Sequence, residues 1–238
     1  MQAETNRVAL VAGASGMVGL ALVRHLVARN EYSRTIAVSR RPLPMEAPRL
    51  ANRIIRFEAM ETELRGLACE DAFCCLGTTL RDAGSPEAFR AVDHDLVLRF
   101  ARVAKTAGAT SLVVVSAAGA SADAGNFYLR VKGETERALE ALQFRSLHLL
   151  QPGLLLGARA QWRPLELLGR VFMPVLNPLL LGRYEQWRGI GVDTVAAAMP
   201  AAALSGRLGV QRYTWRALNA LARTGKAPLR PGKAAARL

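Results

Sequence analysis

Apolar runs of strand length and helical spacings of apolar residues alternate along the first two thirds of the chain. Short runs rich in Val, Ile and Leu predict buried strands at 8–12, 34–39, 53–57, 71–76, 111–115 and 145–150. Apolar residues at helical spacing predict a helix after the first strand and helices at 86–106 and 127–142. Strands that alternate with helices predict an α/β fold, a doubly wound parallel sheet of Rossmann type, which binds ligands beyond the carboxyl ends of its strands.

The pattern changes at about residue 151. Pro152, Pro164, Pro174 and Pro178 divide this part of the chain, and an apolar stretch runs from Leu165 to Leu181. We interpret residues from about 151 as a small C-terminal lobe that closes the substrate side of a single domain covering 1–226. The basic tail at 227–238 is predicted to be disordered. Within the lobe, the sequence predicts a helix at 192–204, a strand at 209–215 and a helix at 216–222.

Three glycines follow directly on the first predicted strand. Gly13, Gly16 and Gly19 have the spacing G-x-x-G-x-x-G, and Val18, Leu22 and Leu26 then mark the buried face of a helix. A helix N-terminus offers free N–H groups and a positive dipole end, and glycines allow a pyrophosphate to approach the backbone. We therefore predict a dinucleotide site here, to which Ser15, Met17 and Val18 also contribute. The alternative is a glycine-rich turn without a ligand.

The residues after the second predicted strand suggest which nucleotide binds. Ser39 lies 20 positions after Gly19 and is followed by Arg40 and Arg41, with no acid nearby. An acid at this place would bind the ribose 2′-hydroxyl of NAD, whereas a hydroxyl and two guanidinium groups suit a 2′-phosphate. The sequence thus predicts NADP(H) in preference to NAD(H). Two solvated arginines in an arginine-rich chain are the alternative interpretation.

A catalytic set is predicted from Ser116, Tyr128 and Lys132. The tyrosine and lysine have the spacing Y-x-x-x-K near the start of a predicted helix, which places them on one face, and Ser116 ends the fifth predicted strand. Tyrosine ordinarily ionises near pH 10, and a nearby ammonium favours its phenolate form. Tyr128 would then exchange a proton with the substrate oxygen, Ser116 would bind that oxygen, and Lys132 would hold the nicotinamide ribose. A surface Tyr–Lys pair is the alternative.

These motifs together resemble the short-chain dehydrogenase/reductase superfamily, and more narrowly its atypical members related to the human Tat-interacting protein. The resemblance covers about residues 7–205. It is carried by the glycine turn and by four segments, which are Phe73-Cys-Cys-Leu-Gly-Thr-Thr79, Phe89-Arg-Ala-Val-Asp-His-Asp95, Tyr128-Leu-Arg-Val-Lys-Gly-Glu134 and Pro152-Gly-Leu-Leu-Leu156.

The resemblance implies a Rossmann fold that binds NADP(H), with the glycines, Ser39, Arg40 and Arg41 at the cofactor. It places a loop of Leu76, Gly77 and Thr78 near the adenine ribose, and Gln151, Pro152 and Gly153 beside the nicotinamide. Two departures stand out. Asp93 occupies a place where extended relatives often carry Asn, and the run Ser116-Ala-Ala-Gly119 lacks a second serine and a lysine found in the human protein.

Composition narrows the class of protein. A chain of 238 residues that is 51% apolar can bury a full core as one domain. The polar start predicts no signal peptide, and no uncharged stretch reaches the length of a membrane helix. Cys69, Cys74 and Cys75 are expected to be core thiols in a reducing cytoplasm. With three scattered histidines, we predict no metal site.

The net charge of +13 bears on partners. Eight basic residues and no acid follow Asp193, a charge balance that suits an anionic membrane surface, a nucleic acid or a phosphorylated substrate. We favour solvated arginines and a buried substrate lid over peripheral membrane contact. Nucleic acid is disfavoured because no basic stripe interleaved with aromatic residues is present. An oligomer is compatible with the sequence.

The leading hypothesis is a cytoplasmic NADP(H)-dependent oxidoreductase that reduces a carbonyl or oxidises an alcohol in a largely apolar pocket. The first alternative is a non-catalytic module in which bound NADP(H) sets a conformation that partners recognise. The second is a sugar-nucleotide epimerase, which we favour less because the C-terminal part is small for a sugar-nucleotide lobe.

Overall fold

The computed structural model describes residues 6–157 and 182–224. Its main sheet has seven parallel strands in the order β3-β2-β1-β4-β5-β6-β9. The strands are β1 (Arg7–Ala12), β2 (Tyr32–Ser39), β3 (Leu50–Ile54), β4 (Asp71–Cys74), β5 (Ser111–Val115), β6 (Ser146–Leu150) and β9 (Gly209–Tyr213). The order reverses at β1, which lies between β2 and β4, so the expected doubly wound α/β fold is confirmed.

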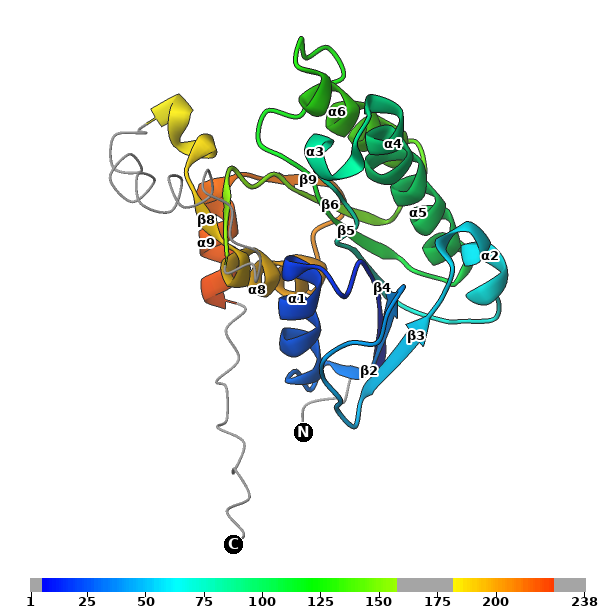
Figure 1. The fold of residues 1–238 in the computed structure, drawn as a ribbon. Helices are drawn as coiled ribbons and strands as arrows, with labels where there is room; N and C mark the ends of the chain where they lie inside the picture. Colours follow the sequence, from blue (N-terminus) through cyan, green and yellow to red (C-terminus); the bar gives the residue numbers. More distant parts are fainter. Residues whose placement is uncertain (1–5, 158–181, 225–238) are drawn as a thin grey trace, which may run out of the picture.

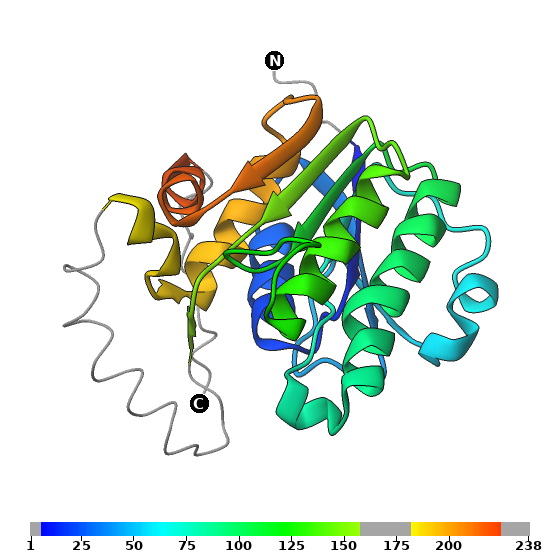
Figure 2. The same ribbon diagram turned by 90° about the horizontal axis from the view of Figure 1, so that it is seen from above.

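Helices cover both faces of the sheet (Figure 1). On one face lie α1 (Met17–Val27), α8 (Val192–Ala203) and α9 (Trp215–Thr224). On the other lie α4 (Pro86–Arg90), α5 (Val97–Thr106) and α6 (Phe127–Glu140). Figure 2, turned by 90°, shows the sheet between these two layers. Because both faces are covered, the inner strands are apolar on both sides.

The two faces of the sheet belong to two separate apolar clusters. Leu10, Ala72 and Leu112 pack toward α5 and α6, whereas Val11 and Phe73 pack toward α1 and α8. The expected buried face of α1 is confirmed, since Val18, Leu22 and Leu26 are 8%, 0% and 0% exposed. Adjacent cysteines follow the same alternation: Cys74 lies in the first cluster and Cys75 packs against the second.

The described residues also form several short elements. They are η1 (Phe57–Ala59), α2 (Met60–Glu63), α3 (Leu80–Ala83), η2 (Ala91–Leu96), η4 (Gly182–Trp187), and a separate two-stranded pair of β7 (Leu155–Leu156) and β8 (Ile190–Gly191).

The third strand differs from its predicted range of 53–57. The structure places β3 three residues earlier, paired with β2 from Leu50 opposite Thr35 to Ile54 opposite Ser39. An edge strand needs few apolar residues, and Ile54 is in fact 54% exposed. The apolar Ile55 and Phe57, which suggested the later range, instead lead into η1.

The predicted helix at 86–106 is helical throughout but is interrupted in its middle. Residues Ala91–Leu96 form a π-helical turn, in which one extra residue per turn rotates everything that follows. As a result Val97 is buried, while Leu96, one residue earlier, is only partly buried. The same turn buries Asp93, which is 1% exposed.

The C-terminal elements follow the predictions with shifts of one or two residues at their ends. Helix α8 packs on α1, and β9 adds to the sheet beside β6. The Leu165–Leu181 stretch and the tail at 227–238 lie outside the described residues. No helix within 6–157 or 182–224 has the length and apolar character to cross a bilayer.

Candidate functional site

The glycine turn joins the carboxyl end of β1 to α1, and its geometry requires glycine. A Cβ on Gly13, whose φ is +76°, would lie 2.6 Å from the carbonyl of Cys75, and one on Gly19 would lie 2.1 Å from the Gly13 oxygen. Gly16 is the N-cap of α1 and no side chain caps the helix. The first N–H groups of α1 are therefore presented beside a backbone surface that an anion can approach closely.

A cavity of about 220 Å³ lies beside this turn. Gly16, Met17 and Val18 line it from the turn, and Tyr128 and Lys132 line it from α6. The loop after β4 contributes Leu76, Gly77 and Thr78 to the same wall, as the resemblance implied. The structure thus brings together residues predicted for cofactor binding and residues predicted for catalysis.

Tyr128 is half-buried and its position is set by aromatic packing. Its ring centroid lies 5.5 Å from that of Phe89, in a tilted arrangement. Phe89 is fully buried at the end of α4. Because packing holds the ring, the phenol group has a defined place in the cavity wall.

Lys132 is 7% exposed, and it forms an ion pair with a buried carboxylate. Its Nζ lies 2.7 Å from Asp93 Oδ1, and the Thr78 N–H donates to Asp93 Oδ2 at 2.7 Å. Burial by itself lowers the pKa of Lys132, but attraction to Asp93, with smaller contributions from Tyr128, outweighs burial and leaves that pKa raised. Lys132 is therefore cationic at neutral pH.

Ser116 lines the same cavity, but its hydroxyl has an internal partner. Ser116 Oγ donates to Glu136 Oε1 at 2.5 Å, and Gln151 Nε2 donates to both Glu136 oxygens at 2.9 and 3.1 Å. Glu136 is 4% exposed, and Arg212 of β9 pairs with it at 3.4 Å. With its proton donated to Glu136, Ser116 presents an acceptor oxygen toward the cavity.

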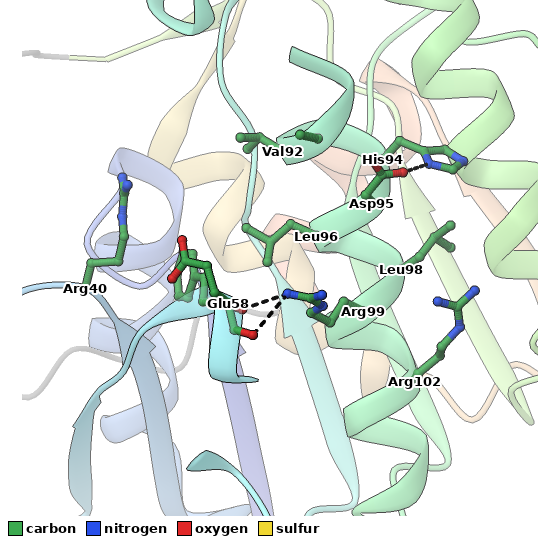
Figure 3. Close-up of a pocket in the computed structure, with 11 residues that line it drawn as sticks. Arg40, Glu58, Val92, His94, Asp95, Leu96, Leu98, Arg99 and Arg102 are labelled. Carbon is green, nitrogen blue, oxygen red and sulfur yellow. Dashed lines mark hydrogen bonds and ion pairs between the residues drawn. The ribbon is translucent and has the colours of Figure 1, made fainter. Parts of the chain in front are cut away.

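A second cavity, of about 650 Å³, lies between η1, η2 and α5 (Figure 3). Arg40 reaches it from the end of β2, with its guanidinium 5.7 Å from the centroid of the Phe57 ring. Arg99 donates to the carbonyl of Phe57 at 3.2 Å and pairs with Glu61, and these contacts tie η1 and α2 to α5. A guanidinium stacked on a ring keeps its edge N–H groups free for a phosphate.

Ser39 and Arg41 lie near this cavity but do not line it. Ser39 is 1% exposed. Its hydroxyl donates to the carbonyl of Arg41 at 2.6 Å, and Asn52 Oδ1 is a second acceptor 3.0 Å from the same hydroxyl oxygen. It therefore shapes the turn that carries the two arginines. Arg41 is exposed on this turn.

The remaining predicted site residues, one from the glycine turn and two from the resemblance, are structural neighbours of the site. Ser15 is exposed in the glycine turn. The carbonyl of Pro152 accepts from Ala118 N–H at 2.9 Å, which joins the ends of β5 and β6. A Cβ on Gly153 would meet the Arg188 carbonyl at 2.5 Å. None of the three lines the 220 Å³ cavity.

Two residues of the site were not among the predicted site residues. Glu136 follows Lys132 by four positions and Tyr128 by eight, so helical spacing places all three on one face of α6. That spacing was the available signal. The resemblance had drawn attention to Asp93 only as a departure from Asn, and the periodicity gave no sign of its burial, because the π turn is not visible there. Within the residues that the structure describes, no cluster of His, Cys, Asp and Glu is arranged to hold a metal ion.

A Rossmann-type sheet with a glycine turn at its switch point defines a nucleotide-binding α/β protein. Comparison with known proteins then identifies the family. Residues 9–140 match the model described as NAD dependent epimerase/dehydratase family. The chain belongs to this family, and its resemblance to the atypical short-chain dehydrogenase/reductase group is confirmed.

Two curated relatives are similar over much of the chain. Protein HTATIP2 of Rattus norvegicus is 35% identical over 198 residues, which cover 82% of this chain and 80% of that protein. Protein FMP52, mitochondrial, of Eremothecium gossypii is 38% identical over 151 residues, covering 63% of this chain and 67% of that protein.

Among solved structures, the Bordetella bronchiseptica enzyme WbmF in complex with NAD+ and UDP is similar in fold. The TM-score is 0.66 at 16% sequence identity, with 93% of this chain and 77% of WbmF covered. At this identity the likeness bears on the fold alone. The free N–H groups and close-approach glycines of the turn fit a dinucleotide pyrophosphate, which supports binding of a nicotinamide nucleotide by this chain.

Proposed function

We propose that this protein is an NADP(H)-dependent oxidoreductase that interconverts a carbonyl and an alcohol. The observation that carries the proposal is one cavity lined by the glycine turn, by Tyr128 and Lys132, and by Ser116. When bound there, the nucleotide supplies or accepts a hydride. The residues Gly13 to Gly19 would hold its pyrophosphate, and Arg40 with Arg41 would hold a 2′-phosphate.

The side chains of the cavity have distinct roles in this proposal. Tyr128 is placed to exchange a proton with the substrate oxygen. Lys132 is cationic and buried, so it stabilises negative charge on that phenol and binds ribose hydroxyls. Ser116, whose proton is donated to Glu136, accepts a hydrogen bond from the substrate in its alcohol form. Glu136 positions Ser116 and Gln151 together.

A non-catalytic NADP(H)-binding module is the second candidate. A specific observation favours it: the polar groups of Ser116 and Lys132 are already bonded to buried carboxylates, as in a purely structural core. In this case nucleotide binding would set a conformation that a partner protein recognises.

A cytoplasmic location remains a prediction, since the FMP52 relatives carry "mitochondrial" in their names.

The preference for NADP(H) is tested by fluorescence titration with NADPH and NADH. We expect NADPH to bind more tightly, and the double variant Arg40→Ala/Arg41→Ala to lose roughly 10- to 100-fold in NADPH affinity, because charge-assisted hydrogen bonds to a phosphate are removed. NADH affinity should hardly change in that variant. Arg137→Ala, an exposed arginine of α6 that lines neither cavity, is the matched control.

Two other results would count against these assignments. Equal affinity of the unaltered protein for NADPH and NADH would contradict the role of the two arginines. If neither NADPH nor NADH bound to the protein, the cofactor assignment as a whole would be overturned.

A further inference from the structure

The 220 Å³ cavity contains two formal charges of opposite sign, and they are in contact. Asp93 and Lys132 are the lining residues charged at neutral pH, with Oδ1 and Nζ 2.7 Å apart. Cys75, which also lines the cavity, keeps a neutral thiol because burial raises its pKa. Behind Ser116 lies Glu136, whose charge is matched by Arg212.

The placement of Asp93 is fixed from three sides. The Thr78 N–H donates to its Oδ2, and the Thr135 hydroxyl oxygen lies 3.0 Å from its backbone carbonyl and 2.8 Å from that of Val131. A Cβ on Gly77 would lie 3.2 Å from Asp93 Oδ1, so the carboxylate lies directly behind the loop that lines the cavity. The π turn buries it to 1% exposure. Asp93 is therefore held beside Lys132 by contacts from the loop after β4 and from α6.

An uncompensated Lys132 would make the cavity discriminate between the two redox forms of a nicotinamide nucleotide. The oxidised ring carries a positive charge and the reduced ring carries none, whereas the rest of the molecule is the same. A lone ammonium in a site of low dielectric would repel the oxidised form by an amount that water barely screens. A carboxylate in contact with the ammonium removes most of that repulsion.

We propose that Asp93 neutralises the charge of Lys132 within the cavity and so sets the relative affinity for the oxidised and reduced nucleotide. The inference rests on the proposed function, because it requires a nicotinamide nucleotide in this cavity. It assigns Asp93 a role in selecting the redox form of the cofactor. Positioning of Lys132 is a separate effect of the same contact, and it acts equally on both redox forms.

The test is the ratio of the dissociation constants for NADP+ and NADPH, measured by calorimetry on the full chain. Asp93→Asn keeps an acceptor for the Thr78 N–H but removes the negative charge. We expect it to weaken NADP+ relative to NADPH by roughly 10- to 30-fold, from one unit charge acting over about 8 Å at an effective dielectric near 20. Changes in ribose or phosphate binding cancel in this ratio.

Asp95→Asn is the matched control. It removes the same charge from the same π turn, but the Asp95 side chain is 64% exposed, pairs with His94 and does not line this cavity. Its ratio should equal that of the unaltered protein. Lys132→Met, which leaves Asp93 as the excess charge, should shift the ratio in the opposite direction. This second variant keeps the test decisive if Asp93→Asn fails to fold.

The outcomes separate the two proposals. An unchanged ratio in Asp93→Asn, or in Lys132→Met if the first variant does not fold, would overturn the inference while leaving nucleotide binding intact. Failure of the unaltered protein to bind either nucleotide would overturn the proposed function and this inference with it.

Discussion

At the scale of single residues, the candidate site consists of paired groups. Lys132 is paired with Asp93, and Ser116 donates to Glu136, so their charge and hydrogen-bond direction are set by buried partners. Tyr128 differs, because ring packing against Phe89 holds it while no hydrogen-bond partner of its hydroxyl is recorded among the described residues. Its phenol is therefore the group of the site most open to a substrate.

Replacement of Tyr128 by Phe tests this directly. The ring and its packing are kept while the proton donor is lost, so turnover should fall by roughly 10²- to 10⁴-fold with NADPH affinity unchanged. The measurement is NADPH oxidation with a panel of aldehydes and quinones, alongside a binding titration. Equal turnover of the variant and the unaltered protein would remove Tyr128 from catalysis. If the unaltered protein binds NADPH but turns over no member of the panel, the result favours a non-catalytic NADP(H)-binding module.

At the scale of elements, helix α6 carries three site residues and is held against the turn after β5. Gly133, next to Lys132, allows this contact: a Cβ there would lie 2.0 Å from the Ser121 carbonyl carbon and 2.3 Å from Ala122 N. The Ser121 N–H also donates to the Leu129 carbonyl at 3.2 Å. Backbone packed on backbone leaves the helix little freedom to shift, and this fixes Tyr128 and Lys132 relative to Ser116.

Substitution of Gly133 by Ala should destabilise the protein, although Ala normally favours a helix over Gly by about 1 kcal/mol. Overpacking against main-chain atoms that cannot rotate away should cost about 1–3 kcal/mol or more in the free energy of unfolding, measured by urea titration. Gly125→Ala, in the loop before α6 and with open space around its Cβ, is the control and should be near neutral. Similar midpoints for the two variants would show that the turn is free to move.

At the scale of the whole molecule, the sheet also buries polar groups away from the candidate site. His148 of β6 is 1% exposed, its Nδ1 lies 3.0 Å from the Tyr213 hydroxyl, and its Nε2 has no hydrogen-bond partner among the described residues. Burial lowers the pKa of His148 from 6.5 to about 4. The folded protein therefore keeps this histidine neutral under conditions in which the unfolded chain protonates it.

Stability should consequently decrease as the pH falls from 6.5 to about 4, because only the unfolded chain takes up this proton in that range. The contribution is at most about 3 kcal/mol. Chemical unfolding at several pH values should show a shallower pH dependence for His148→Gln than for the unaltered protein. Tyr213→Phe, which removes the hydrogen bond but keeps the histidine, should retain the full dependence. Parallel curves for His148→Gln and the unaltered protein would contradict this account.

Local patterns in the sequence determined the sheet, the glycine turn and the shared helix face of Tyr128 and Lys132. Each of these depends on residues within a few positions of one another, through strand alternation, helical spacing or the conformational demands of glycine. The third strand was misplaced for a related reason, since an edge strand is held by backbone pairing with β2 and needs little apolar character.

Tertiary structure alone decided the partners of the site residues. Asp93 meets Thr78 and Lys132, and Glu136 meets Ser116 and Gln151, across chain separations of 15 to 39 residues. These contacts depend on how α5 and α6 pack on the sheet and on a π turn that rotates Asp93 inward. No periodicity along the chain encodes such a rotation, because its stabilisation comes from groups on other elements. The sequence therefore indicated the residue types of the site, and only the fold established how their charges and hydrogen bonds are matched.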